Sequence, residues 1–111
     1  MKPVLVITTV GENFDSRELA AMLVTQRLAA CVNIIPNLFS VYRWSGKVTR
    51  DYEQLLIIKA DAGKVDELKA ALLEHHPYEV PEFLIVPVET VPGPYADWLE
   101  ASLSEAPSPV R

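Results

Sequence analysis

The sequence contains little cysteine, little glycine and no excess of positive charge, and each shortage excludes a class of protein. One cysteine, Cys31, cannot form a disulfide within the chain, so no oxidising compartment is implied. The four glycines do not cluster, so there is no glycine-rich loop of the kind that binds phosphate groups. Ten Lys and Arg residues against 15 Asp and Glu residues give a net charge of −5. That balance argues against nucleic acid as a partner, because such binding needs cationic side chains at the phosphates, and it favours a surface that attracts cations.

Long apolar segments are missing as well. The chain passes from Met1 into residues 4–7, an apolar run that is too short for the core of a signal peptide. No segment approaches the roughly 20 apolar residues that a membrane span needs. We therefore expect a cytosolic protein without a membrane partner.

The sequence is rich enough in apolar residues to form a folded core. Half of its 111 residues are hydrophobic, and this length suits one domain. We expect a single domain over residues 1–103 followed by a flexible tail over residues 104–111, which has two prolines and little to bury.

Apolar periodicity and turn signals predict four strands and three helices. Asp15 with Glu18 has the form of a capping box, and apolar residues then recur at a spacing of four, as on one face of a helix. Asp61 is expected to open a second helix and Pro94 a third. The order β-α-β-β-α-β with a terminal helix indicates an α+β, ferredoxin-like sheet with its helices on one face. The expected strands are residues 4–10, 31–44, 47–59 and 83–88.

The two central strands form an unusually long hairpin. Pro36 marks a bulge or an edge, and Ser45-Gly46 supplies a tight turn. Each arm has roughly 13 residues, or about 43 Å, whereas a usual strand spans about 17–20 Å. The far end must therefore project and carry exposed apolar side chains, which invite association. We predict a homo-oligomer whose hairpins pair between subunits. The projecting apolar side chains are Leu38, Phe39, Val41, Tyr42 and Trp44.

Several blocks of the sequence carry a family resemblance that runs from about Val4 to Leu103. They are residues 28–34 with Pro36, Ser40-x-Tyr42-x-Trp44-x-Gly46, Glu53, Lys59, residues 76–82 and Tyr95-x-x-Trp98. Together they resemble the divalent cation tolerance family called CutA. The resemblance implies a ferredoxin-like subunit in a tight homotrimer shaped like the PII signalling proteins, with a link to copper and other divalent metals.

The chain departs from that family pattern at two places. Ala60 stands where the family commonly has a threonine after Lys59. A single cysteine also excludes a site with several thiolates within one subunit.

Cys31 is one candidate metal ligand. Thiolate and imidazole groups both suit copper. Cys31 also begins a predicted strand, where a free cysteine commonly packs as a small apolar side chain. Nothing cationic lies near it in the sequence to hold it as a thiolate. Both interpretations stay open.

His75 and His76 end the second predicted helix. Adjacent side chains on a helix point about 100° apart, so the two rings do not readily serve one ion. The negative end of the helix dipole would also stabilise a protonated ring, which cannot bind a metal. Either histidine can therefore be a simple helix-terminal residue.

Polar side chains follow His76 within six residues. The imidazole of His76, the phenol of Tyr78 and the carboxylates of Glu79 and Glu82 lie on a segment that two prolines stiffen. Two interpretations stay open for this segment: it lines a small polar cleft at a subunit boundary, or it is a turn with solvated carboxylates. The predicted metal ligands are His76, Glu79, Glu82 and Cys31.

The aromatic side chains and the missing enzyme motifs narrow the function further. Tyr42, Trp44, Tyr95 and Trp98 suit packing in the core and at interfaces better than stacking on a ligand. No Gly-x-Ser-x-Gly, metal-protease or zinc-finger pattern is present. A nucleophilic pair of Cys31 and the distant His76 stays open but has no positive support.

The function that we expect is that of a homotrimer, not an enzyme, that binds divalent metal ions, Cu(II) foremost, and contributes to metal tolerance. The metal is not expected to be needed for folding. One alternative is a PII-like regulatory trimer that binds a small anionic ligand between subunits. Another is a purely structural trimer that anchors a partner.

Overall fold

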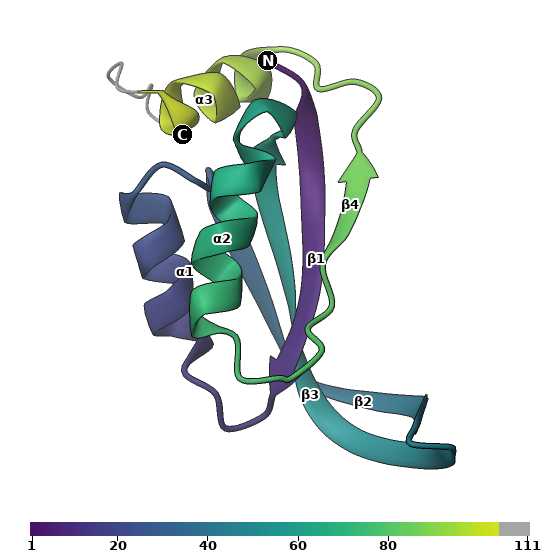
Figure 1. Cartoon of the computed structure of the whole chain (residues 1–111). Coiled ribbons are helices and arrows are strands. Elements are labelled where there is room, and N and C mark those ends of the chain that lie inside the picture. Colours follow the sequence, from purple (N-terminus) through teal and green to yellow (C-terminus); the bar gives the residue numbers. More distant parts are fainter. Residues whose placement is uncertain (105–111) are drawn as a thin grey trace.

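The structure, a computed structural model, describes residues 1–104 in four strands and four helices (Figure 1). The predicted flexible tail lies outside the described residues, apart from Ser104. The elements in chain order are β1 (Pro3–Gly11), α1 (Ser16–Thr25), β2 (Cys31–Trp44), β3 (Lys47–Asp61), the 3-10 helix η1 (Ala62–Lys64), α2 (Val65–His75), β4 (Leu84–Pro87) and α3 (Pro94–Leu103).

The four strands form one sheet of order β2-β3-β1-β4, and every neighbouring pair is antiparallel. This order confirms the predicted ferredoxin-like arrangement. The last strand is shorter than predicted, because β4 pairs only with the first half of β1. Pro87 also removes a backbone donor at its end. β2 and β4 are consequently the two open edges of the sheet.

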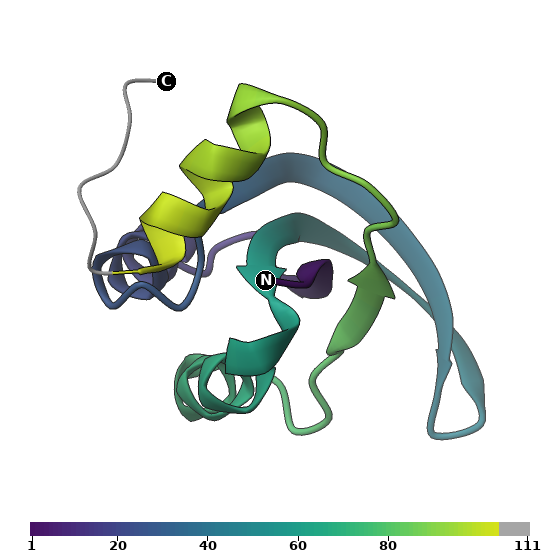
Figure 2. The same cartoon turned by 90° about the horizontal axis from the view of Figure 1, so that it is seen from above.

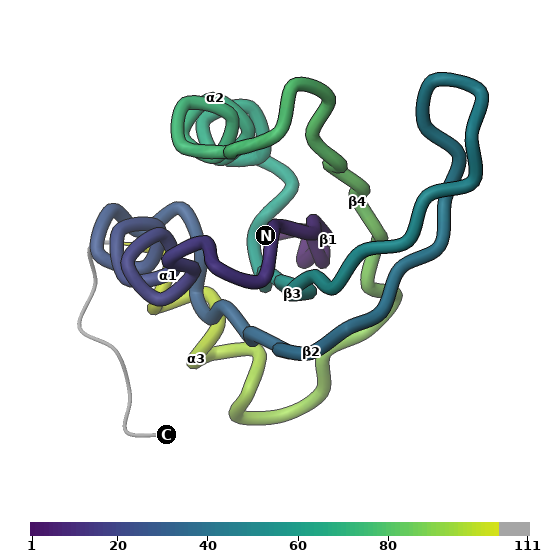
Figure 3. The backbone as a smooth tube through the Cα atoms, turned by 90° about the horizontal axis from the view of Figure 1, so that it is seen from below, coloured from purple at the N-terminus to yellow at the C-terminus, as the bar shows by residue number. Residues whose placement is uncertain are grey.

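Helices cover the two faces of the sheet unequally. α1 and α2 lie against one face, and α3 crosses the other side near the start of β2 (Figures 2 and 3). Side chains of β1 alternate between buried and half-buried, so Val6 and Val10 enter the core beneath the helices. Leu23 of α1 and Leu68 of α2 meet them there and are fully buried. A smaller cluster joins α3 to Ala30.

Aspartates cap α1 and the 3-10 helix η1. The cap of α1 was predicted, whereas the second aspartate was expected to open α2. Asp15 caps α1, because its carboxylate accepts the backbone N–H of Glu18 at 3.1 Å. Asp61 does not open α2 directly. Its carboxylate accepts the N–H of Gly63 at 3.3 Å and that of Lys2 at 3.0 Å, and a single 3-10 turn precedes α2.

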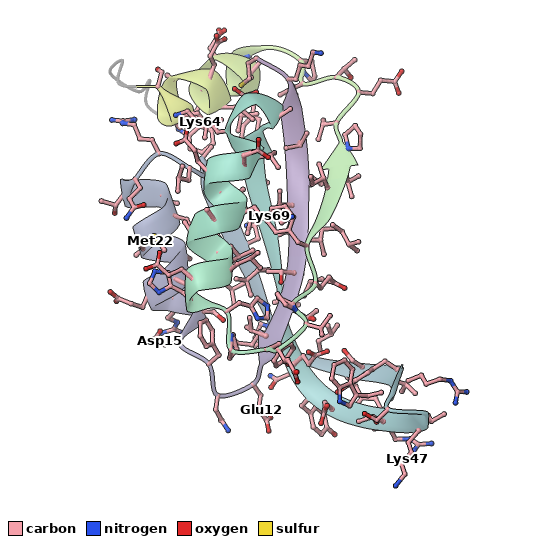
Figure 4. All side chains as sticks on the ribbon, in the orientation of Figure 1. Glu12, Asp15, Met22, Lys47, Lys64 and Lys69 are labelled. Carbon is pink, nitrogen blue, oxygen red and sulfur yellow. The ribbon has the colours of Figure 1, made fainter. Side chains whose placement is uncertain are left out.

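The long hairpin is confirmed. Its projecting part, residues 37–53, is here called the ribbon. The pairing register shifts between Ile35 and Leu38, and Asn37 has a φ of 61°. This is the bulge that Pro36 indicated. Ser45 and Gly46 have φ values of 51° and 77°, as a tight hairpin turn with two left-handed residues requires. The ribbon bends away from the body to its tip at Lys47, and the chain is 47 Å long (Figure 4).

The pleat of the ribbon divides its side chains between two faces. Paired residues share a face, so Leu38, Ser40, Tyr42 and Trp44 lie with Asp51 and Glu53 on what we call the inner ribbon face. The opposite side is the outer ribbon face, where large apolar side chains are each more than half exposed. The outer ribbon face comprises Phe39, Val41, Arg43, Val48, Arg50 and Tyr52.

Candidate functional site

A pocket of about 510 Å³ lies between the inner ribbon face and the segment that follows α2. Figure 1 shows that segment crossing the end of β1, where the ribbon begins to bend away. The ribbon forms one wall and residues 77–82 form the other, with Thr9 of β1 between them. The lining includes four carboxylates: Asp51, Glu53, Glu79 and Glu82.

The two walls are joined by a phenol-carboxylate hydrogen bond. The hydroxyl of Tyr78 donates to Oε2 of Glu53 at 2.6 Å. Glu53 is only 6% exposed, so this bond is made where water has little access. Burial, and then the bond to Glu53, raise the pKa of Tyr78, which therefore stays protonated as the donor.

A second pair of the same kind lies further along the ribbon. Tyr42 donates its hydroxyl to the carboxylate of Asp51, and this bond raises the pKa of Tyr42. Burial and the nearby charge of Glu53 raise the pKa of Glu82. Four carboxylates thus share the pocket with two phenols, and burial disfavours the charged form of one carboxylate, Glu82.

His76 does not line the pocket, but its ring holds the segment that carries Tyr78 against β1. Its Nδ1 accepts the backbone N–H of Tyr78 at 3.1 Å, and since an amide can only donate, Nδ1 carries no proton. Nε2 therefore carries the proton and donates to the carbonyl of Thr9 at 3.0 Å, with the hydroxyl of Thr8 also close. The ring is neutral in this arrangement and both of its nitrogens are engaged.

The expectation from the helix dipole is wrong for His76. The negative end of α2 would raise its pKa, yet burial outweighs the favourable contacts and lowers it. The reason is that His76 is the residue after α2 ends, with extended backbone, and its ring turns inward to β1.

The structure brings only part of the predicted ligand set together. Glu79 and Glu82 both line the pocket, whereas His76 lies behind Tyr78 and outside the lining. Cys31 pairs with Lys59 at the other end of β2, and its thiol lies 3.9 Å from Oδ1 of Asn33. Among residues 1–104, no group of three or more His, Cys, Asp or Glu side chains could hold a metal ion.

Sequence reasoning assigned no site role to the ribbon side of the pocket. The sequence favoured packing over ligand stacking for Tyr42 and Trp44, Ser40 entered only as a motif residue, and Asp51 was not singled out. A signal was present, because Ser40, Tyr42 and Trp44 stand at every second position of one strand and so share one face. Which face turns toward residues 77–82 depends on the bend of the ribbon.

We predict that Tyr78→Phe lowers the free energy of unfolding by about 1–2 kcal/mol, because it leaves the buried Glu53 carboxylate without its donor. Urea denaturation at a fixed protein concentration measures this. Tyr42→Phe is the matched control, since it removes the same group from the exposed Asp51, and it should change stability by less than about 0.5 kcal/mol. Equal losses in the two variants would contradict the role given to Glu53.

Nearly the whole chain is similar to known proteins of one family. The family model described as "CutA1 divalent ion tolerance protein" matches residues 4–102. The divalent-cation tolerance protein CutA of Thermus thermophilus is 43% identical over 99 residues, which cover 89% of this chain and 95% of that protein. CutA1 from Oryza sativa superposes with a TM-score of 0.88 at 38% identity, over 96% of this chain and 97% of that one. A structure described as the PII-like protein CutA from Nostoc has a TM-score of 0.71 at 35% identity, over 80% and 82% of the two chains.

The sheet order, the long ribbon and the α3 cover define a small α+β protein of the ferredoxin-like class, with a PII-like relative. The sequence comparisons and the structural comparisons both indicate one family within this class. This chain belongs to the CutA1 divalent ion tolerance family.

Proposed function

We propose that this protein is a cytosolic homotrimer that binds divalent cations, Cu(II) foremost, and contributes to metal tolerance without catalysing a reaction. The observation that carries the proposal is a pocket with four carboxylates in a chain of the divalent ion tolerance family. No helix among the described residues is long and apolar enough to cross a membrane.

Exposed apolar surface supports the trimer. Phe39, Val41 and Tyr52 on the outer ribbon face are 52%, 58% and 57% exposed, and Phe39 and Tyr52 form an edge-to-face pair. Leu84 and Ile85 of the edge strand β4 are about half exposed as well. A monomer would leave these side chains and two strand edges in water. Pairing of the ribbon with the sheet of the next subunit, repeated around a ring, covers both.

The carboxylates of Glu79 and Glu82 are the proposed metal ligands. Both come from the segment held by His76, and both line the pocket. Since one chain supplies no group of three ligands within residues 1–104, the set is completed by a second subunit or by water. His76 acts by positioning this segment, because its ring nitrogens are already engaged. The cluster of buried apolar side chains beneath the helices supports folding without a metal.

The lining of the pocket disfavours the alternative of a small anionic ligand. No Lys, Arg or His side chain of the described part of the chain lines it. An anion there would face four carboxylates without a counter-charge. The acidic pocket thus favours a cation over an anion in the PII-like framework.

Calorimetric titration with Cu(II) alone tests the metal site. We expect Glu79→Gln/Glu82→Gln to weaken Cu(II) binding at least about tenfold, or 1.4 kcal/mol, because both charged ligands become neutral. Glu89→Gln/Glu100→Gln is the matched control, since it removes two exposed carboxylates outside the pocket. The assignment fails if both double variants bind Cu(II) as the unaltered protein does.

A further inference from the structure

The acidic pocket has features that a bare metal ion does not use. Protein ligands hold a metal ion at about 2.0–2.6 Å and must converge on one point. The four carboxylates of the pocket are instead distributed over both of its walls, and no metal-holding group of three occurs in the described residues. A volume of about 510 Å³ falls in the range of sites for small organic molecules.

Glu53 is the buried anchor of this pocket. It is 94% buried, and its Oε2 accepts the hydroxyl of Tyr78. Its other oxygen, Oε1, accepts no hydrogen bond from any residue in the part of the chain that the structure describes. Oε1 keeps some contact with solvent, so a ligand can reach it, and a cationic N–H is the strongest donor for a carboxylate.

Aromatic side chains complete the walls. Trp44 and Tyr42 extend from the inner ribbon face, and Tyr78 lies on the opposite wall. The hydroxyls of both tyrosines are committed to Asp51 and Glu53, so it is the rings that remain for a ligand. Aromatic faces attract ammonium and guanidinium groups and also pack against flat apolar bodies.

The charge of the pocket favours a cationic ligand over a neutral one. Four carboxylates crowd this one pocket: Asp51, Glu53, Glu79 and Glu82. No cationic side chain from residues 1–104 lines the pocket to relieve that crowding. A ligand that brings one positive charge would do so.

We propose that this pocket binds a small organic amine, with a primary ammonium group donating to Oε1 of Glu53 and a flat apolar body between Trp44 and Tyr78. A primary ammonium suits the site better than a quaternary one, because only the former can donate hydrogen bonds. The proposal goes beyond divalent-ion binding and does not depend on it.

Calorimetric titration with phenethylamine, in buffer containing EDTA, tests the proposal on the full chain. We expect a Kd on the order of 1 mM or tighter for a ligand of this size. The neutral analogue 2-phenylethanol has nearly the same body and should bind at least about tenfold more weakly. Because EDTA removes free divalent ions, this result is independent of whether Cu(II) binds.

Two variants locate the amine. Glu53→Gln keeps an acceptor for Tyr78 but loses the charge, and should weaken phenethylamine binding at least about fivefold. Trp44→Ala alters an exposed residue without touching the core and should weaken it about twofold to fivefold. Glu89→Gln, outside the pocket, should leave it unchanged. The proposal is overturned if phenethylamine does not bind at 10 mM (about ten times the expected Kd), if 2-phenylethanol binds equally well, or if neither pocket variant weakens binding.

Discussion

Phe39→Lys/Val41→Lys is expected to convert the proposed trimer into monomers. Both side chains lie on the outer ribbon face and are more than half exposed in the single chain, so the substitutions leave the core of the subunit intact. In the assembly they would bury two ammonium groups per subunit beside Arg43 and Arg50, which share that face. Burying unpaired like charges costs several kcal/mol, enough to weaken association by several orders of magnitude.

Sedimentation velocity at micromolar concentration measures the effect as a threefold fall in mass. Val24→Lys/Leu73→Lys is the matched control, because it places two lysines at exposed apolar positions on α1 and α2, away from the ribbon. The control should remain trimeric. A ribbon variant that keeps the full mass would show that the outer ribbon face is not an interface.

His76→Ala is expected to lower the free energy of unfolding by about 2 kcal/mol near neutral pH. The variant removes the acceptor of the Tyr78 N–H and the donor to the Thr9 carbonyl, two bonds of about 1 kcal/mol each. It also removes the edge-to-face contact between the rings of His76 and Tyr78. His75→Ala is the matched control, since His75 is exposed, and it should change stability by less than about 0.5 kcal/mol.

The loss of unfolding free energy caused by His76→Ala should be smaller at acidic pH than at neutral pH. Burial lowers the pKa of His76 in the folded protein below its ordinary value of 6.5, so the unfolded chain binds more protons just below that pH. Stability from this residue is therefore complete above about pH 7 and is lost as the pH falls through 6.5 toward the lower folded pKa. Urea unfolding at pH 7.5 and pH 5.5 should show a smaller penalty at the lower pH. A penalty that grows on acidification would contradict the neutral ring.

Local chemistry made the framework of this fold predictable. Asp15 caps a helix because its carboxylate reaches a backbone N–H three residues on, and such a contact needs no knowledge of the rest of the chain. The bulge near Pro36 and the turn at Ser45-Gly46 were predictable for the same reason. A missing backbone donor and left-handed backbone conformations both act within a few residues. β1 begins with apolar residues on both faces, so the side that the helices cover did not follow from its sequence, and Thr8 is buried there beside Val6 and Val10.

The site was less predictable because it joins segments that are distant in the sequence. Tyr78 and Glu53 lie 25 residues apart, and they meet only because the segment after α2 crosses the end of β1, where Gly11 pairs with Glu53 of β3. His76 was grouped with Glu79 and Glu82 because they are neighbours in the sequence. The ring instead turns to Thr9, 67 residues away, where a strand carbonyl offers a better partner than solvent. Whether Cys31 ever binds a metal stays a prediction, since the fold keeps it away from the pocket.

The mass of the unaltered protein in dilute solution decides whether three chains associate through their ribbons, as proposed. Sedimentation equilibrium at low micromolar concentration should give one species of about 37 kDa, three times the 12.4 kDa of the chain. Apolar side chains on the outer ribbon face and on β4 would then be covered. A single species of 12.4 kDa would contradict the account, because those surfaces would be stable in water without a partner.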